Sequence, residues 1–270
     1  MRDLKKIILY GIVLVFIAAV LLYVPPIILV LLVCHWYLSL GIQSIFMHRY
    51  SAHGQIQMSS RVEKAFWILA FILLGPSYLS AYISGLLHRL HHAYSDSPAD
   101  PHPADMFHGP WGLFQLMWRT KVYYSDIGSG KYKVDEKFKE NVPEWESFDK
   151  FASSWWCRMA WVGIYIFVYI SIDPPLWCYP LLLIHFIMGP LHGVVINWFA
   201  HKYGDAPHET GDSSKNVFDH DILMGGEAYH NDHHKYPSSP NFGIEGQYDM
   251  YYHWMLFLER LGFIKIKKTT

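Results

Sequence analysis

The sequence HNDHH, residues 230–234, decides how the rest of the chain must fold. On a helix its histidines, His230, His233 and His234, are three and four residues apart, so we expect their imidazoles to project from one face toward one point. The stretch HRLHH, residues 88–92, repeats this spacing. Both stretches are typical of a metal-binding face, and distant parts of the chain must then meet there.

Two more stretches add histidines: HRYSAH, residues 48–53, and NWFAH, residues 197–201. The nine candidate ligands are His48, His53, His88, His91, His92, His201, His230, His233 and His234. Imidazoles without partner cysteines indicate iron, zinc or copper, and nine ligands are too many for a single ion. The sequence therefore predicts a site for two metal ions.

The composition is that of a membrane protein. Of 270 residues, 52% are hydrophobic and 17% charged, and the net charge of −1 excludes a nucleic-acid-binding protein of the basic-patch kind. Cys34, Cys157 and Cys178 form no CxxC pair, so neither a disulfide framework nor a thiolate metal site is implied. With no repeat or low-complexity linker, we expect one domain over residues 1–270, embedded in the lipid bilayer.

Four apolar runs are long enough to cross a bilayer as helices. They are residues 7–24, 27–47, 155–172 and 176–196. A proline pair at 25–26 and the sequence DPP at 173–175 separate the members of two hairpins. A signal peptide is the alternative for the first run, but its apolar part is longer than the usual stretch of about 7 to 15 residues.

A fifth apolar run, residues 65–87, has spanning length, but we expect it not to cross. A crossing would separate His53 from His88 by a hydrocarbon core of about 30 Å, whereas one metal site requires them together. Gly75-Pro76 permits a break into two shorter helices, so we expect an interfacial or re-entrant segment. A plain span, with histidines that form no single site, is the alternative.

His48 and His53 are five residues apart. Five residues of α-helix rotate the side-chain direction by roughly 500°, so the two rings share a face only if the helix bends or ends between them. We therefore place this pair at the exit of a helix.

The segments 88–150 and 197–270 are more polar, and we expect them to form a cap on one side of the membrane. The positive-inside rule places this cap, all nine histidines and both basic chain termini in the cytoplasm, because the hairpin tips contain no lysine or arginine. The expected fold class is an all-α integral membrane protein. It has four transmembrane helices in two hairpins, a non-crossing interfacial helix and a cytoplasmic cap that carries the two-metal site.

Other polar residues are candidates for supporting roles. Acids near the histidines, which could hold the outer ring nitrogens of the ligands, are Asp96, Asp100, Glu227 and Asp232, with ordinary surface acids as the alternative. His35, His185 and His192 lie inside apolar runs, and we expect them to make interhelical hydrogen bonds.

In their order, interleaved with two hydrophobic hairpins, the four histidine stretches resemble the membrane fatty acid desaturases of the stearoyl-CoA desaturase type, from about Ile27 to the C-terminus. The resemblance implies that the nine histidines bind two irons (Fe2+/Fe3+) near the cytosolic surface, and that an acyl chain reaches them through a bent tunnel. It also implies that Asn197 holds one metal through a water. The DPH at 100–102 and the GGEAYHNDHH at 225–234 fit the same family.

Two departures from that family matter. The residues directly before HRLHH are Gly-Leu-Leu at 85–87, where animal acyl-CoA enzymes carry an arginine-aspartate type pair that helps hold the CoA, so acyl-CoA and acyl-lipid both stay open. The HPGG motif of a fused cytochrome b5 domain is not present, so we expect a separate ferredoxin-like or cytochrome b5-like electron donor. Arg119, Lys121 and the charged residues 131–150 are its expected docking surface.

The expected activity is insertion of a cis double bond into a long saturated acyl chain, with dioxygen as co-substrate and two electrons from the donor. Breaking an unactivated C–H bond needs a stronger oxidant than a hydrolytic zinc, and two redox metals can together reduce dioxygen to one. One alternative is a membrane fatty acyl hydroxylase with the same histidine machinery. The other is a non-enzymatic metal-binding membrane protein.

Overall fold

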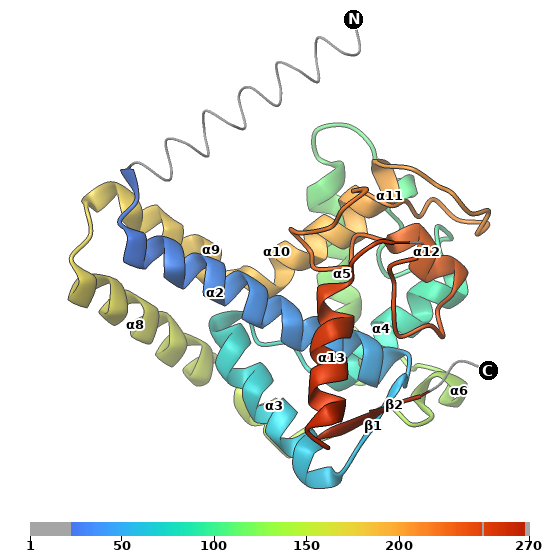
Figure 1. The fold of residues 1–270 in the computed structure, drawn as a ribbon, viewed down its shortest axis with the longest axis horizontal. Helices are drawn as coiled ribbons and strands as arrows, with labels where there is room; N and C mark the ends of the chain where they lie inside the picture. The colour runs from blue at the N-terminus through green and yellow to red at the C-terminus, as the bar shows by residue number, and fades with distance from the viewer. Residues whose placement is uncertain (1–22, 245, 268–270) are drawn as a thin grey trace, which may run out of the picture.

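The computed structural model describes residues 23–244 and 246–267, and this part of the chain is mostly helical. Figure 1 shows long helices on the left and the histidine-bearing helices α4, α11 and α12 gathered at the opposite end. The predicted first span, residues 7–24, lies almost wholly outside the described residues, so the first hairpin stays a prediction.

Among the described residues, two helices are long and apolar enough to cross a membrane. One joins α2 (Pro26–Ile42) to the π-helix η1 (Gln43–Ala52), and the other is α8 (Trp155–Ile172). They cover the predicted spans 27–47 and 155–172. Two bent helix pairs would raise the number of candidate spans to four.

The surface of α8 is apolar almost from end to end. Phe167 and Ile170 are 69% and 59% exposed, and within this helix only Tyr169 is buried. An uncovered apolar face of this size is what a bilayer covers. Trp155 and Trp156, at the start of the helix, are also exposed, as expected for aromatic residues at the membrane interface.

Polar contacts join the apolar helices α2, α9 (Leu182–Phe186) and α10 (Met188–Val194). His35 Nδ1 lies 2.7 Å from His185 Nδ1, and Gln43 Nε2 donates to His192 Nδ1 over 2.8 Å. The prediction that these three histidines make interhelical hydrogen bonds is confirmed. Paired in this way, buried imidazoles cost little inside an apolar bundle.

The fifth apolar run is broken, as its Gly-Pro pair predicts. It forms α3 (Ser60–Leu74), the 3-10 turn η2 (Gly75–Ser77) and α4 (Ala81–Tyr94), and the two long pieces meet at 80°. Gly75 has a φ of 51°, a conformation that glycine adopts without strain. The bend directs α4 away from α3 and toward the other histidines. That this segment does not cross the membrane stays a prediction.

The predicted fourth span, residues 176–196, is also bent. Its pieces are η4 (Leu176–Leu181), α9, α10, the π-helix η5 (Val195–Phe199) and α11 (Ala200–Lys202). The two halves meet at 72° beside Ile187. Pro190 donates no backbone hydrogen bond, and the N–H of Gly189 instead donates to Ser77 Oγ in η2 over 3.0 Å. The two bends therefore pack against each other.

His48 and His53 lie at the exit of a helix, as predicted. The helix does end at His53, but before that it widens into the π-helix η1, whose hydrogen bonds span five residues. The N–H of His53 donates to the carbonyl of His48 over 3.1 Å. This wider turn brings residues five apart closer to the same face than an α-helix does, and the ring centroids of His48 and His53 lie 5.0 Å apart.

The segments predicted to form the cap contain shorter elements. They are η3 (Ala104–Met106), α5 (Gly112–Gly128), α6 (Glu136–Lys139), α7 (Glu146–Ala152), α12 (His230–Lys235) and α13 (Met250–Arg260). Residues 23–244 and 246–267 also form one small sheet, which an all-α prediction leaves out: β1 (Ile56–Met58) pairs antiparallel with β2 (Ile264–Ile266). This sheet fixes the segment after η1 against the end of α13.

Candidate metal centre

The nine predicted ligands come from four places in the fold, and the helices α4, α11 and α12, which carry most of them, lie at one end of it (Figure 1). The π-helix η1 and its C-cap carry His48 and His53, and α11 carries His201. The other six are on α4 and α12, namely His88, His91, His92, His230, His233 and His234. The structure brings all nine together in two adjoining groups.

In the first group, one nitrogen from each of His48, His53, His88 and His233 lies within 4.8 Å of the others. His92 belongs here too, because its Nε2 is 2.9 Å from His88 Nε2 and 3.0 Å from His233 Nε2. Nitrogens about 2.1 Å from a shared ion would be about 3.0–3.4 Å apart. The observed spacing therefore fits five imidazoles around one metal.

The second group consists of His91, His201, His230 and His234, with ligand atoms again within 4.8 Å of one another. Nε2 of His230 lies 3.0 Å from Nε2 of His201. Among the described residues, Nε2 of His91 and Nε2 of His234 have no hydrogen-bond partner although both are buried. Buried polar atoms are normally paired, so unpaired nitrogens converging on one point fit a second metal.

Each HxxHH triad divides between the two groups, which corrects the expectation that its three rings point to one place. His88 and His92, four residues apart, enter the first group, while His91 enters the second. On α12 the assignment is reversed, since His230 and His234 enter the second group and His233 the first. Residues i and i+4 differ by about 40° around a helix axis, whereas i and i+3 differ by about 60° in the opposite sense. Two facing triads can therefore interleave.

Carboxylates and a hydroxyl hold the outer nitrogens of several rings. His48 Nδ1 lies 2.5 Å from Glu227, His91 Nδ1 3.0 Å from both oxygens of Asp100, and His234 Nδ1 2.7 Å from Asp212. His201 Nδ1 lies 3.1 Å from the hydroxyl oxygen of Ser213. A carboxylate accepts a hydrogen bond, so it keeps the proton on Nδ1 and leaves Nε2 free to bind a metal.

Of the four predicted acids, Glu227 and Asp100 contact ligand rings directly. Asp96 bonds the backbone N–H and hydroxyl of Ser213, so it acts one step further out. Asp232 instead accepts from Asn216 and lies 3.1 Å from His208 Nε2, away from the nine ligands. Asp212 was missed by sequence reasoning, because it lies in a loop far along the chain with no local pattern to mark it.

A buried ion cluster supports Glu227. The guanidinium of Arg49, which is fully buried, contacts Glu227 over 2.5 Å and Asp249 over 2.7 Å. Burial alone would raise the pKa of Glu227, but His48 and Arg49 outweigh it and lower that pKa to about 2. The carboxylate is therefore ionised at neutral pH. Neither Arg49 nor Asp249 was predicted as part of the site.

The protonation of the ligands suits metal binding. Burial holds the pKa of His230 and His233 well below the ordinary value, and neighbouring histidines lower it further. Burial likewise lowers the pKa of His102 to about 3. These imidazoles are neutral at pH 7, the form in which a ring nitrogen offers its lone pair to a metal.

Asn197 lies in η5, one turn before His201 in the sequence, and is partly buried. Its position there follows from the same helix that delivers His201. The metal-bound water that it would hold stays a prediction.

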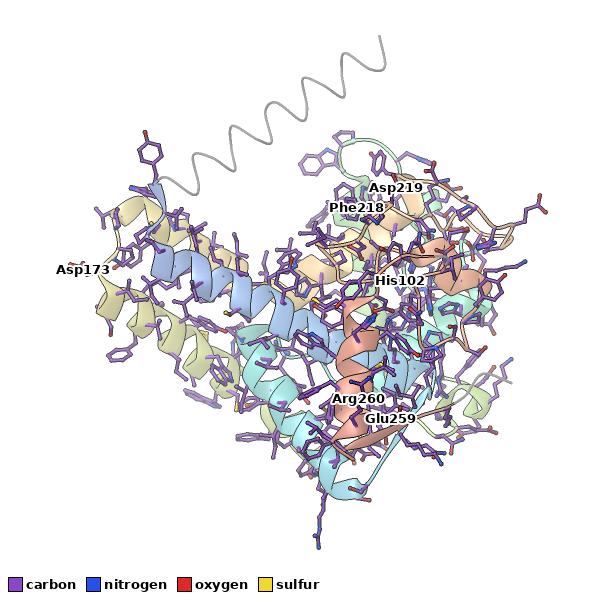
Figure 2. All side chains as sticks on the ribbon, viewed as in Figure 1. His102, Asp173, Phe218, Asp219, Glu259 and Arg260 are labelled. Carbon is purple, nitrogen blue, oxygen red and sulfur yellow. The ribbon has the colours of Figure 1, made fainter. Side chains whose placement is uncertain are left out.

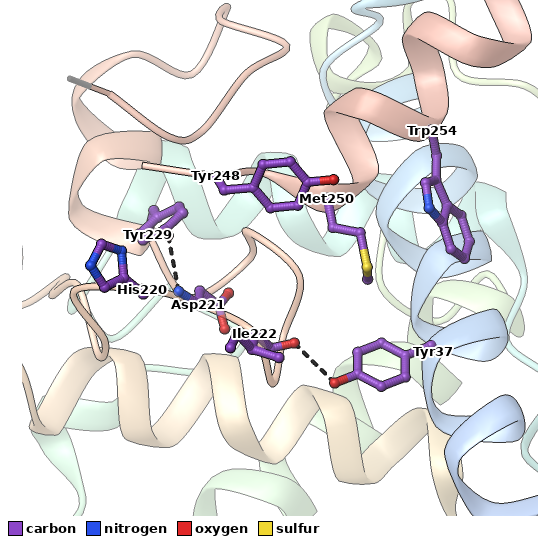
Figure 3. A pocket seen from close by; sticks show the side chains of 8 residues that line it. All are labelled: Tyr37, His220, Asp221, Ile222, Tyr229, Tyr248, Met250 and Trp254. Atoms are coloured by element: carbon purple, nitrogen blue, oxygen red, sulfur yellow. Dashed lines mark hydrogen bonds between the residues drawn. The ribbon is translucent and has the colours of Figure 1, made fainter. Parts of the chain in front are cut away.

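A cavity of about 410 Å³ lies between α2, α13 and the segment before α12 (Figure 3). Its wall is largely aromatic, with Tyr37, Tyr229 and Trp254 around it. Two hydrogen bonds shape this wall: Tyr229 Oη accepts from the N–H of Asp221 over 2.9 Å, and Tyr37 Oη donates to the carbonyl of Ile222 over 3.1 Å. Since Tyr229 directly precedes His230, the cavity borders the metal-binding helix.

Comparison with known proteins gives one consistent family. A model described as fatty acid desaturase matches residues 7–245. The chain is 25% identical over 259 residues to the hex-5-enoyl-[acyl-carrier protein] acetylenase of Moorena producens, covering 87% of this chain and 74% of that protein.

Two acyl-lipid enzymes are also similar. The sn-1 stearoyl-lipid 9-desaturase of Synechocystis sp. is 27% identical over 190 residues, which cover 66% of this chain and 53% of that protein. Delta-9 acyl-lipid desaturase 1 of Arabidopsis thaliana is 26% identical over 226 residues, which cover 83% and 69% respectively. The chain thus spans about half to three quarters of the length of these relatives.

Proposed function

Because the chain belongs to the fatty acid desaturase family, we propose that it inserts a cis double bond into a long saturated acyl chain, consuming one dioxygen and two electrons. The protein is an oxidoreductase with apolar helices suited to a membrane. The observation that carries the proposal is the pair of interleaved histidine groups, which offers two adjoining metal sites built only from imidazoles.

The proposed metals are two irons. The first would be held by His48, His53, His88, His92 and His233, and the second by His91, His201, His230 and His234, with Asn197 acting through a water. Bound iron would supply the oxidising power that removal of two unactivated hydrogens requires. A ligand set of neutral imidazoles suits iron better than magnesium or calcium, which prefer oxygen ligands.

The protein's own groups orient the ligands and keep water out. Glu227, Asp100 and Asp212 each fix one imidazole with its proton on Nδ1, so that Nε2 faces the metal. All nine ligand rings take part in ring contacts with histidines of α4 or α12. A closed, dry centre limits side reactions of a strong oxidant.

The acyl chain is proposed to reach the centre from the membrane side. The cavity beside Tyr229 has the apolar and aromatic lining that suits an alkyl chain, with few polar groups. Leu86 and Leu87, at the positions of the charged pair of acyl-CoA enzymes, are 1% and 6% exposed and pack in an apolar cluster. They present no charge to a CoA, so the proposal favours a lipid-bound acyl chain.

The electron donor is proposed to dock on the cap near Lys121 and the charged segment 131–150. Arg119, which was expected to share this surface, is committed elsewhere. Its guanidinium donates to the carbonyls of Pro98 and Asp100, and so holds the turn behind His91. Since rim charges act mainly on the association rate, Lys121 is the better candidate for contact with the donor.

The metal centre and both termini are proposed to face the cytoplasm. In a background without the native cysteines, Asp173→Cys at the tip of the second hairpin should react with a membrane-impermeant maleimide added to intact spheroplasts. Lys235→Cys, which replaces an exposed residue on α12, should react only after permeabilisation. Labelling of Lys235→Cys in intact spheroplasts would overturn this sidedness.

The reaction is tested by feeding deuterated stearate to a strain that lacks its own desaturase and expresses this protein with a ferredoxin or cytochrome b5 donor. Monounsaturated product with two deuteriums lost should form only when oxygen is present, and should appear first in membrane lipids. Labelled hydroxy acids in its place would assign a hydroxylase. If neither product forms with a competent donor, the acyl substrate class is wrong.

A further inference from the structure

His102 lies at the end of the turn that follows α4, at the histidine end of the molecule (Figure 2). Asp100 organises this turn, because its carboxylate accepts from the N–H of Asp96 over 2.9 Å and of His102 over 2.8 Å. The same carboxylate bonds Nδ1 of His91. One side chain therefore fixes both a ligand ring and the backbone that carries His102.

The ring of His102 packs on a ring of the second group. Its centroid lies 4.3 Å from that of His91, with the planes tilted by 30°, and His102 is only 4% exposed. One nitrogen of His102 lies within 4.8 Å of a nitrogen of His91 and of a carboxylate oxygen of Asp100, in a group that shares only His91 with the second group. The residue thus stands beside the centre on the side where Asp100 closes it.

Both ring nitrogens of His102 lack a hydrogen-bond partner among the described residues. The outer nitrogens of His48, His91 and His234 are each held by a carboxylate, so an imidazole free at both nitrogens is unusual in this cluster. A buried polar group without a partner is rare unless something outside the protein pairs with it. A metal or its bound water would do so.

The two groups also differ in number. The first has five imidazoles once His92 is counted, and the second has four. We propose that His102 adds an imidazole to the second group by holding a water bound to that metal, beside the water proposed for Asn197. This inference rests on the two-metal site of the proposed function and adds a tenth histidine to it.

The test uses His102→Phe, because phenylalanine keeps the flat ring and the packing on His91 but has no nitrogen. If His102 only fills space, this exchange removes two unpaired buried nitrogens, and metal binding should not change. If His102 holds a metal-bound water, the purified variant should bind its second Fe2+ at least about 10-fold more weakly than wild type, since outer partners of metal ligands contribute about 10–100-fold. His108→Ala, an exposed histidine in the same segment, is the matched control.

Iron per protein and the 57Fe Mössbauer spectrum are measured on wild type, both variants and His102→Gln, whose amide can partly replace the lost nitrogen. Loss of one iron site in His102→Phe, with partial recovery in His102→Gln, supports the proposal. Two irons of wild-type affinity and unchanged spectrum in His102→Phe overturn it while leaving the two-metal site intact. If wild type itself binds no iron, the metal assignment under the proposed function fails, and with it this inference.

Discussion

Replacement of His233 by alanine is expected to lower turnover by at least about 100-fold, because the loss of an outer partner of a metal ligand alone costs about 10–100-fold. Nε2 of His233 lies 3.1 Å from that of His48, 3.4 Å from that of His88 and 3.0 Å from that of His92. It is the ring that α12 adds to the first group, so its loss opens that group on one side.

The fold should survive this change. The other four imidazoles of the first group remain, and the helix α12 is also held by Asn216, which bonds Asp232 and the N–H of Asn231. Turnover is measured as unsaturated acyl product per mole of purified enzyme, alongside iron content. His253→Ala removes an exposed histidine of α13 and should leave both unchanged. Wild-type turnover in His233→Ala would refute the assignment of this residue.

The second large effect is expected at Arg49, where Arg49→Met should destabilise the protein by about 3–5 kcal/mol. The guanidinium contacts Glu227 and Asp249, donates to the carbonyl of Pro240 over 2.9 Å and lies 3.8 Å from the ring centroid of Phe242. Removing it leaves two buried carboxylates without their counter-ion. Removing one partner of a buried ion pair is far more costly than never having built the pair.

For a chain of this size, such a loss would lower the melting temperature by roughly 6–20 °C, since about 1 kcal/mol shifts it by about 2–4 °C. Thermal unfolding in detergent, followed by circular dichroism, measures it. Arg61→Met, at an exposed position on α3, should change stability by less than about 0.5 kcal/mol. The melting temperature of Arg49→Lys should lie between those of Arg49→Met and wild type, because one ammonium cannot bond both carboxylates with the same geometry. If Arg49→Met and wild type have the same melting temperature, the ion cluster does not stabilise the fold.

Arg49 also links stability to the metal centre. It fixes Glu227, and Glu227 in turn fixes His48, so the same buried charge supports the fold and orients a ligand. Family membership has already decided against a non-enzymatic metal carrier, because the chain belongs to a family of desaturases. The choice between desaturation and hydroxylation depends on the position of the acyl chain relative to the metals, which the labelled-stearate experiment addresses.

The sequence by itself determined the membrane class, the nine histidines and the break at Gly75-Pro76. These are local properties. Apolar length follows from bilayer thickness, ring direction follows from residue spacing on a helix, and a Gly-Pro pair ends a helix wherever it stands. The same spacing explains how two HxxHH triads interleave, but the sequence does not show that the two helices face each other.

The tertiary structure decided what depends on distant partners. Asp212 reaches His234, Asp249 reaches Arg49, and the bend at Ile187 follows from packing of Gly189 against Ser77. No local pattern marks such contacts, because each is chosen by the packing of helices far apart in the chain. Even the pairing of His48 with His53 depends on a π-helix. This form is rare and occurs mostly at functional sites, so a local sequence pattern does not predict it.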